Sequence, residues 1–594
     1  MNSDVNPLNT YFLQYDHVTP PSVMASKKTI ERVWHVLAGV TIGLALIYIQ
    51  WRWSYSLNLE NYAFSIMVAT AESCTLFGTI LIYFDIWSDG ESQFVDAHTV
   101  SQERTFEADV PTSVDIFITT YDEGPNVIKY TLEDASKVIA PEHVDVRLYI
   151  LDDGNQPGMR RLCDEYGASY FSRESNVGFK AGNLRNALMQ TSGAFIVICD
   201  ADTRLFTTFL TNTLPYFQDP NVAWVQTPHW FYDIPGLTNR LVDSPKSTSN
   251  WNNHLGNLAD KALSFLRLRD PFSSNPEVFF DVIQRRRSRN NASFCCGAGS
   301  IHRRAAIMEG LRISSMNSRR RTSNPFAQKP GTVSTFLSSE EPFVFHVSED
   351  ILTSIRLHNL GWKSVYHPKI EAKMLSPWSS RAWAMQKWKY SGGTFDIMLR
   401  HNPIFRSGMP WKTKLHYLAT FYSYLSVLWV SVLCVAPVLS MLFSWSPVSA
   451  YSIEFFSYLL PVLVLNELTM YLGCRGYNTH RGRAMSLATL PIQLHAACQV
   501  LKGNSPKFPT TPKAPESNVE WKVAIPILSI LLFYISSLIW GFVATYLHLE
   551  GYSWSLFVVN AFWICTILIV FLRATCMLFW KPEFEISKIS AAHS

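Results

Sequence analysis

Charged residues are scarce in this chain, and the cysteine pairs that bind structural metals are missing. Asp, Glu, Lys and Arg make up 16% of the 594 residues, against about 25% in a typical soluble protein. The net charge is only +4, which excludes the strongly basic surface of a nucleic-acid-binding protein. The ten cysteines include no Cys-x-x-Cys pair, which argues against a zinc site. No internal repeat stands out.

The chain has long apolar runs instead. A transmembrane helix needs about 20 predominantly apolar residues. Six runs are long enough, namely Val33–Trp51, Tyr62–Trp87, Leu415–Phe443, Phe455–Leu472, Val523–Leu547 and Leu556–Phe579. We therefore expect a multi-pass protein of a plasma or inner membrane rather than a soluble protein with six buried helices. The first run starts late and lacks a small-residue cleavage site, so we do not expect a signal peptide.

Basic residues predict the orientation, because cytosolic loops carry an excess of Lys and Arg. Lys27, Lys28 and Arg32 precede the first run. Between the fourth run and the fifth lie Arg475, Arg481, Arg483, Lys502, Lys507 and Lys513, among others. Two spans from a cytosolic N-terminus put residues 88–414 in the cytosol, and the parity then places both termini there.

The spans divide the chain into seven expected parts. These are a cytosolic N-terminal tail (1–32), two transmembrane helices (33–87), a cytosolic domain (88–400), an interfacial helix with two transmembrane helices (401–475), an interfacial helix with a loop (476–520), two transmembrane helices (521–580) and a cytosolic tail (581–594). The apolar segment Met485–Leu501 is interrupted by Pro491 and His495. It therefore predicts an interfacial helix rather than a seventh span.

Short β-rich runs alternate with helical stretches in the cytosolic part. Expected strands lie at 114–121, 146–154 and 193–202, and expected helices at 126–138 and 182–190. This alternation predicts a mostly parallel sheet covered on both faces, an α/β domain of the Rossmann-like kind.

Two carboxylates follow the third expected strand. Asp200 and Asp202 are separated by one residue, and such a pair can share a hard divalent cation, Mg²⁺ or Mn²⁺, that bridges a nucleotide diphosphate. Lys180 would place a positive charge beside the same diphosphate. Ligands bind at the carboxyl ends of strands in such sheets, although turn-forming acids that merely end strands remain the alternative. Further acidic strand ends, suited to a uracil or ribose contact, are Asp122, Asp152 and Asp153.

A third acidic motif precedes an amphipathic stretch. Asp350, after Glu349, is a candidate general base, because an acceptor hydroxyl must lose its proton as it attacks a sugar. The alternative is structural: Ser348 would be a helix N-cap followed by an acidic first turn.

Together these motifs resemble the membrane-embedded, processive family-2 glycosyltransferases, and most closely the cellulose synthases. The resemblance covers about residues 30–580 and implies a GT-A-type catalytic domain. The second span carries Glu72 where the family also has a glutamate. The matching stretches, in the order of the family, are "LDDGN", "KAGNLRNAL", "DADT", "VQTPHWFYD", "FCCGAGSIHRRAAI", "SEDILTSIRLHNLGWKSVY", "MLSP" and "QKWKY".

The resemblance implies a role for each matching position. Donor-binding residues would be Asp122, Asp152 and Asp153 at the uridine, Lys180, Asp200 and His229 at the diphosphate, and Gln386 and Lys389 at the channel mouth. Asp200 and Asp202 would bind the metal, Asp350 would be the catalytic base, and the acceptor would contact Phe294, Cys296, Gly297, Glu349 and Tyr390. "KFPTTPK" is similar to the family's gating loop through Phe508, Thr511 and Lys513; a flexible linker is the alternative.

Several positions depart from the family's pattern. "QKWKY" has the spacing of Gln-x-x-Arg-Trp, but Lys389 lacks the bidentate geometry of arginine and Tyr390 offers a smaller ring than tryptophan. We therefore expect a subgroup with a different acceptor pose, whose linkage need not be β-1,4. Ser348 replaces a threonine, and residues 308–347 form a long insertion. We expect the carboxy-terminal cyclic-dinucleotide-sensing domain of the bacterial enzymes to be missing.

The resemblance implies a processive, inverting β-glycosyltransferase. It would polymerise glucose from UDP-glucose into a linear, cellulose-like β-glucan and move the product through its own channel. The sequence leaves open a β-1,3 (curdlan-like) or mixed-linkage glucan synthase, a chitin or hyaluronan synthase, and an inactive polysaccharide channel or assembly partner. The expected partners are UDP-glucose, the growing glucan and the lipid bilayer, without nucleic acid; the oligomeric state, which could include a homo-oligomer, is not determined.

Overall fold

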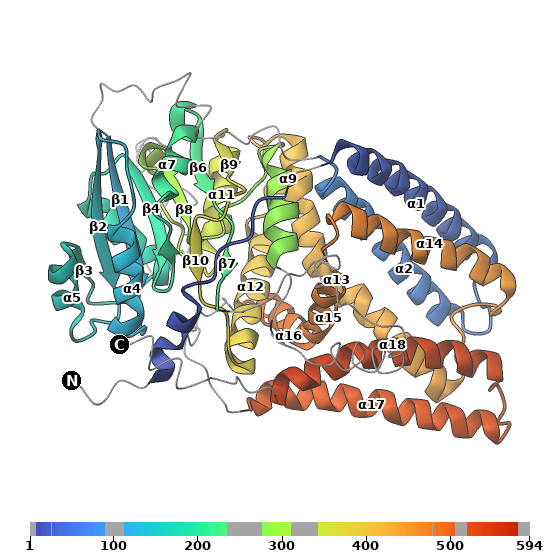
Figure 1. Cartoon of the computed structure of the whole chain (residues 1–594). Helices are drawn as coiled ribbons and strands as arrows, with labels where there is room; N and C mark the ends of the chain where they lie inside the picture. Colours follow the sequence, from blue (N-terminus) through green and yellow to red (C-terminus); the bar gives the residue numbers. More distant parts are fainter. Residues whose placement is uncertain are drawn as a thin grey trace, which may run out of the picture.

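The structure is a computed structural model that describes residues 7–24, 27–88, 112–233, 272, 276–309, 342–477, 479–504 and 519–579. A sheet domain lies on the left of Figure 1 and a block of long helices on the right. Helices α9 and α12 lie where the two parts meet.

A seven-stranded sheet forms the centre of the first part. Its strands, in spatial order, are β3 (Ser169–Ser172), β2 (Val144–Asp152), β1 (Thr112–Thr120), β4 (Phe195–Asp200), β8 (Ser300–Arg303), β6 (Val222–Gln226) and β9 (Lys363–Tyr366). Only β8 runs antiparallel to its neighbours β4 and β6. The three strands expected from the sequence are β1, β2 and β4. Their apolar runs are buried on both faces, as is usual for central parallel strands, and the expected mostly parallel α/β fold is confirmed.

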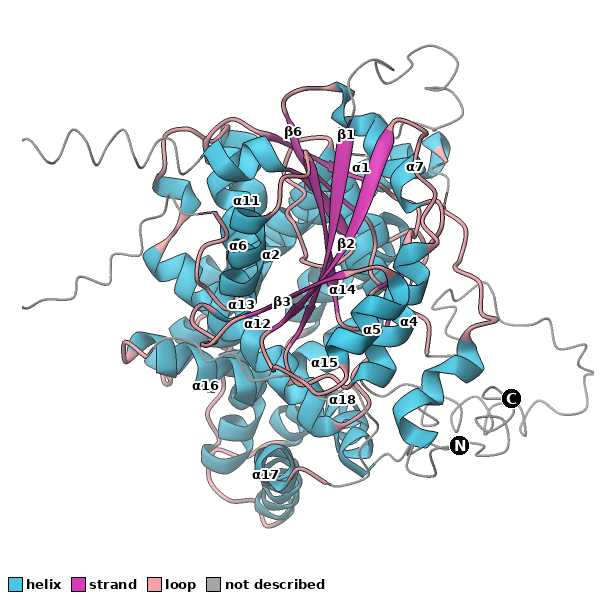
Figure 2. Cartoon of the chain, turned by 90° about the vertical axis from the view of Figure 1, so that its left-hand side faces the viewer, coloured by secondary structure: helices cyan, strands magenta, loops and turns pink. Residues whose placement is uncertain are grey.

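Helices cover both faces of this sheet, as Figure 2 shows. Helices α4 (Pro125–Ser136) and α5 (Met159–Tyr166) lie on one side, and α6 (Phe179–Gln190) and α11 (Glu349–Asn359) on the other. In α4, a proline occupies the first turn, where no N–H is needed, and Ile128, Leu132 and Ala135 form its buried stripe. The shorter elements are α7 (Phe209–Thr213), η2 (Leu214–Gln218), η4 (Val278–Gln284), α9 (Arg285–Ser288) and η5 (Pro403–Phe405).

A second, three-stranded sheet lies beside the first. It consists of β5 (Arg204–Leu205), β10 (Ala372–Met374) and β7 (Trp230–Phe231) in that order. Before the first long helix, the segment η1 (Pro7–Tyr15) packs against this small sheet and α4. The sequence alone predicts no more than a tail for this segment.

Within the described parts of the chain, six helices are long and apolar enough to cross a membrane. They are α1 (Lys28–Tyr55), α2 (Tyr62–Asp85), α13 (Trp411–Phe443), α14 (Ile453–Gly473), α17 (Trp521–Tyr546) and α18 (Trp554–Phe579). Each overlaps one of the six runs expected from the sequence, and the second and fifth runs reach one or two residues beyond their helices, so the expected number of spans is confirmed. At about 1.5 Å per residue, α13 is longer than a bilayer core, which leaves its first turns free to contact the sheet domain.

Three other helices accompany the spans. Helix α12 (Ser380–Arg400) precedes η5, and η5 is the only helical element that the structure describes between residues 401 and 410. The segment expected as one interfacial helix is two helices, α15 (Thr479–Ala488) and α16 (Leu490–Leu501), which meet at a bend of 53°. The bend falls just before Pro491, which removes a backbone donor from the helix.

A buried charged cluster joins the sheet domain to the long helices. Arg286 binds Glu31 of α1 at 2.7 Å, and Arg287 binds Asp85 at the end of α2 at 3.0 Å. His416 of α13 contacts the same carboxylate at 2.6 Å. Because each carboxylate has a charged partner, the interface can bury these groups without leaving them unpaired. The sheet domain is thereby fixed directly to three of the long helices, α1, α2 and α13.

Candidate active site

The register of the central strands brings the acidic strand ends to one edge. Strands β1, β2 and β4 run parallel, with Thr120 opposite Asp152 and Thr119 opposite Asp200. The two aspartates therefore end their strands at nearly the same level, on either side of β1. Asp122 follows at the exposed end of β1. This edge is where an open α/β sheet binds its ligand.

Asp152 organises the turn that follows β2. Its buried carboxylate accepts hydrogen bonds from the backbone N–H groups of Gly154 and Gln156, both at 2.8 Å, and from the Tyr170 hydroxyl at 3.0 Å. At Gly154 a Cβ would lie 1.6 Å from the Tyr121 carbonyl oxygen, so only glycine fits there. The turn is thus held against the end of β1. These contacts are the ones expected of an acid that forms a turn at the end of a strand. The expected role of Asp152 at the uridine stays a prediction.

Asp153 forms a bidentate ion pair with Arg173. The guanidinium donates to both carboxylate oxygens, at 2.7 and 2.5 Å. It also donates to the carbonyl oxygens of Val177 and Phe179, at 2.8 and 3.1 Å. Burial raises the pKa of the Asp153 carboxyl, and Arg173 opposes that shift. The arginine ties the β2 turn to the start of α6, a role that no sequence motif marks.

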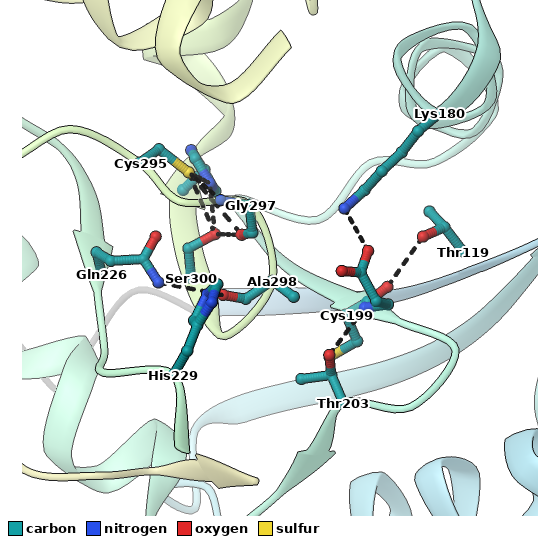
Figure 3. Close-up of polar contacts among 12 residues, drawn as sticks. Thr119, Lys180, Cys199, Thr203, Gln226, His229, Cys295, Gly297, Ala298 and Ser300 are labelled. Atoms are coloured by element: carbon teal, nitrogen blue, oxygen red, sulfur yellow. Dashed lines mark hydrogen bonds and ion pairs between the residues drawn. The ribbon is translucent and has the colours of Figure 1, made fainter. Parts of the chain in front are cut away.

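Lys180 and Asp200 meet as an ion pair at the centre of the site. Figure 3 shows the lysine side chain extending from its helix toward the end of β4. Burial lowers the pKa of Lys180, but the carboxylates of Asp200, Glu349 and Asp350 outweigh it and leave the pKa raised. The lysine is therefore a permanent positive charge among three acids. Its predicted proximity to Asp200 is observed.

The two candidate metal ligands differ in exposure. The Asp200 side chain is 45% exposed, whereas Asp202 is buried and accepts a hydrogen bond from the Leu375 N–H at 3.0 Å. Among the described residues, no group of three or more His, Cys, Asp or Glu side chains could hold a metal ion. Two carboxylates fit a hard cation only if phosphate oxygens and water complete its shell. The donor set is therefore suited to a cation that arrives with a diphosphate.

A glycine turn forms the wall opposite Lys180. Gln226 accepts from the Cys296 N–H at 2.8 Å and donates to the Ala298 carbonyl oxygen at 3.1 Å. His229 donates to that same oxygen at 2.9 Å (Figure 3). Gly297 has a φ of +91°, a conformation that favours glycine. Gln226 therefore fixes the wall, although nothing within the "VQTPH" stretch singles it out.

Other wall residues lie deeper. Phe294 is buried and stacks on Tyr417 of α13 with ring centroids 6.3 Å apart. It supports the wall from behind.

Burial lowers the pKa of His229, while its bond to Ala298 and the nearby Asp200 oppose the shift only in part, so the imidazole is neutral at neutral pH.

The expected base lies beside Gly297. A Cβ built on that glycine would lie 3.6 Å from Asp350 Oδ2 and 3.7 Å from Lys180 Nζ. Burial raises the pKa of Glu349 to about 8, and the neighbouring Asp350 adds to the shift. Burial also raises the pKa of Asp350, against the N–H of Ile351, which donates to its carboxylate at 2.8 Å. The Asp350 carboxylate, the Lys180 ammonium and Gly297 thus surround one small volume.

Both acids occupy the first turn of α11, where the helix dipole favours negative charge. Ser348 is the N-cap residue, but its side chain makes no capping hydrogen bond. The N-cap position of Ser348 and the acidic first turn are those that the structural alternative expects, apart from the missing side-chain bond, and the role of Asp350 as a base stays a prediction.

Helix α12 carries the "QKWKY" motif along the same site. The helix begins at Ser380, capped by Ser379, so Gln386 lies in its second turn and does not start it. Gln386 and Lys389 are half-buried, and Tyr390 is 48% exposed. The Lys387 ammonium lies over the Tyr390 ring, 5.9 Å from its centroid.

Two contacts bind α12 to the loop of the base. At Gly393 a Cβ would lie 2.1 Å from Ser348 Oγ, so the helix backbone touches the loop directly. Asp396 accepts from His346 Nε2 at 3.1 Å, while His346 Nδ1 accepts from the Ser348 N–H at 2.9 Å. The expected gating-loop residues Phe508, Thr511 and Lys513 lie outside the described residues.

Comparison with known proteins gives matches over most of the chain. Residues 115–311 match the family model "Glycosyl transferase family 2", and residues 343–475 match the model "Cellulose synthase". The cellulose synthase catalytic subunit (UDP-forming) of Pseudomonas fluorescens (strain SBW25) is 25% identical over 88% of this chain and 65% of its own length. The corresponding cellulose synthase 1 catalytic subunit of Komagataeibacter xylinus is 26% identical over 70% of this chain and 48% of its own length.

The chain therefore spans about half to two thirds of the length of these curated relatives. Among solved structures, a mannosyltransferase from Pyrobaculum calidifontis in complex with GDP-Man and Mn²⁺ is 13% identical, covering 74% of this chain and 99% of its own, with a TM-score of 0.41.

Proposed function

Since the chain belongs to the cellulose synthase-like family 2 glycosyltransferases, we propose that it is a processive, inverting β-glycosyltransferase that polymerises glucose from UDP-glucose. One observation carries the proposal. Asp350 and Lys180 approach the same glycine, Gly297, from two sides, with Asp200 bound to the lysine. A base and a cation within one small volume suit a displacement that takes a proton at one end and releases a diphosphate at the other.

The donor would bind at the acidic strand ends. Asp200 and Asp202 would hold Mg²⁺ or Mn²⁺, which when bound neutralises charge on the leaving diphosphate. Lys180, now paired with Asp200, would turn to the phosphate oxygens. The half-buried, neutral His229 would lie beside the diphosphate without adding charge. Asp122, Asp152 and Asp153 would shape the uridine side.

Asp350 would act on the acceptor. Its carboxylate removes the proton from the non-reducing-end hydroxyl as the hydroxyl oxygen forms a bond to the anomeric carbon. The bond from that carbon to the UDP oxygen breaks, and UDP carries away the electron pair. A single displacement on an α-linked donor leaves a β-linkage. Glu349, protonated below pH 8 because its pKa is about 8, would leave Asp350 as the ionised member of the pair.

The acceptor sugar would lie against Gly297, Cys296 and Tyr390. The tyrosine offers half of its surface as a stacking face, and the half-buried Gln386 and Lys389 border it. Lys387 lies over the same ring at 5.9 Å. A lysine and a tyrosine at these positions favour a β-1,3 or mixed-linkage glucan as the second candidate product, because they present the terminal sugar differently from arginine and tryptophan.

A cavity among the long helices supports translocation. Its volume is about 340 Å³ and its lining comes from α1, α2, α13, α14 and α18. Aromatic and polar side chains mix in it, as a sugar chain requires, including Tyr48, Tyr451, Trp563, Glu72 and Asn560. Long helices before and after the sheet domain both contribute to this lining, which agrees with a channel built from the two groups together.

The orientation proposed is cytosolic for the catalytic domain and for both termini. The segment before α1 packs on the sheet domain, so the two lie on one side of the membrane. A donor made in the cytosol then reaches the site directly.

The decisive experiment uses the purified full chain with radiolabelled UDP-glucose, Mg²⁺ or Mn²⁺ and linkage analysis of the product. We expect a β-glucan, and Asp350→Asn to abolish it. Asp219→Asn is the matched control, because this exposed carboxylate pairs with Lys363 far from the site at 2.8 Å. Incorporation only from UDP-GlcNAc would refute the choice of sugar and favour a chitin or hyaluronan synthase. Unchanged output from Asp350→Asn would refute its role as base, and no transfer from any UDP-sugar would favour an inactive channel.

A further inference from the structure

The segment before the first span is built into the sheet domain. Tyr11 and Phe12 are only 1% and 2% exposed. The Tyr11 ring packs edge-on against Trp378 at 5.5 Å, and the Phe12 ring against Tyr130 of α4 at 5.7 Å. A tail that only linked the domain to the membrane would not bury two aromatic rings.

Asp233, just after β7, connects this segment to the loop after β10. The Tyr11 hydroxyl donates to Asp233 at 2.7 Å in a buried position. Asp233 also accepts from the Ser376 N–H at 3.1 Å and from the Trp378 indole N–H. Burial raises the pKa of the Asp233 carboxyl, so its stability depends on these donors. Tyr11 therefore completes the set of donors around a buried acid.

The same loop holds the candidate metal ligand. The Leu375 N–H donates to Asp202 Oδ2 at 3.0 Å, one residue before Ser376. Two buried carboxylates thus accept hydrogen bonds from adjacent residues of one loop. Asp202, the candidate metal ligand, binds the Leu375 N–H, and Asp233, the partner of Tyr11, binds the Ser376 N–H. A shift of Asp233 is passed to Asp202 through a single peptide unit.

A second anchor lies at the strand that follows Asp202. Arg204 of β5 and Lys373 of β10 stand opposite each other in the small sheet. Asp16 binds both, at 2.6 and 3.0 Å. Arg204 has a further partner in Asp134 at 2.6 Å. Without Asp16, two cations would face each other across the strand pair, two residues beyond Asp202.

We propose that residues 10–16 are a positioning strap for the donor site, which sets the place of Asp202 and thereby the affinity for a nucleoside diphosphate with its divalent cation. The inference rests on the proposed function, because it concerns the same site. The strap leaves the base untouched, since none of its contacts described above reaches Asp350 or α11. Its loss therefore weakens donor binding more than the transfer step.

The test uses the full chain in detergent or nanodiscs with two variants, Tyr11→Phe and Asp16→Asn. Tyr11→Phe keeps the packed ring and removes only the hydroxyl. Asp16→Asn keeps the size of the side chain and removes the negative charge that Arg204 and Lys373 share. Asp16→Glu keeps this charge and should restore much of the donor binding. Glu133→Gln is the control, because it breaks an exposed ion pair with Lys137 on the neighbouring α4.

The readouts are the binding of UDP with Mn²⁺ by calorimetry, Mn²⁺ binding by electron paramagnetic resonance, and kcat and KM separately. Changes in the surroundings of a metal ligand cost about 10-fold or more in metal affinity. We expect Kd and KM to rise by about that factor in both variants, with kcat nearly unchanged and the control unaffected. A lower Tm with unchanged Kd values would overturn the inference, as would a fall in kcat alone. A wild-type protein that binds no UDP with Mn²⁺ would overturn the proposed function itself.

Discussion

Gly393 is where α12 touches the loop of the proposed base, and the substitution Gly393→Ala tests whether that contact positions the base. A Cβ at this residue would lie 2.1 Å from Ser348 Oγ, 2.9 Å from Val347 Cγ1 and 3.1 Å from Ser348 Cβ. Rotation of the serine hydroxyl relieves only the first of these contacts. The helix or the loop must therefore move, and Asp350 lies only two residues beyond Ser348.

Stability and activity should respond very differently to this change. Overpacking costs about 1–3 kcal/mol, and alanine regains about 1 kcal/mol over glycine in a helix interior. The net loss of folding free energy is thus at most about 2 kcal/mol. A displacement of about 1 Å at a catalytic group can cost about 100-fold in rate. We expect the rate to fall far more than the folded fraction.

The assay is glucose transfer from radiolabelled UDP-glucose, together with thermal unfolding of the same preparation. Gly39→Ala is the matched control, because a Cβ added to this helical glycine of α1 would meet nothing within 4 Å. The double variant Gly393→Ala, Val347→Ala should recover part of the rate, since it removes the Val347 Cγ1 contact at 2.9 Å that rotation of the serine hydroxyl does not relieve. A wild-type rate for Gly393→Ala, or a loss matched by unfolding, would refute the reasoning.

Two further predictions concern the charges of the site. Lys180→Met should lower kcat/KM for the UDP-sugar by about 100-fold, the usual loss when one preorganised charge partner of a leaving group is removed; a value equal to that of the exposed control Lys363→Met would contradict this. Glu349→Gln should remove a pH dependence of stability. The pKa of Glu349 is about 8 in the folded protein and 4.5 in its ordinary state, so its contribution is complete below about pH 4.5 and is lost as the pH rises through 8. Each pKa unit is worth about 1.4 kcal/mol, so the Tm of the wild type should fall over this window more than that of the variant, and parallel curves would contradict the buried acid.

Local signals explain why much of the fold could be predicted. Apolar runs of bilayer length and strands alternating with helices are properties of short stretches, and all six spans and strands β1, β2 and β4 lie where those patterns put them. The acids at the strand ends follow from the same patterns. The strands β5 and β7 have no such signal. Each has only two residues, which is too few to reveal an alternation of apolar and polar side chains.

Contacts between distant parts of the chain account for the features that no sequence pattern predicts. Tyr11 and Asp233 are 222 positions apart, and nothing in either stretch marks the other. Arg173 and Gln226 act through backbone groups brought near by folding, so their residue types alone predict no partner. The start of α12 also differs from the motif, since the helix begins after the cap at Ser379 and not at Gln386.

The sequence by itself determined the membrane spans, the α/β domain and the family of the catalytic motifs, because hydrophobic length, periodicity and motif order are all written along the chain. Only the tertiary structure decided that Lys180 and Asp350 approach Gly297, that α12 touches the loop before Asp350 at Gly393, and that the N-terminal segment packs on the small sheet that follows Asp202. These arrangements depend on strand register, helix packing and shared counter-ions. Such properties arise when residues hundreds of positions apart are pressed together, and no single stretch of the chain contains them.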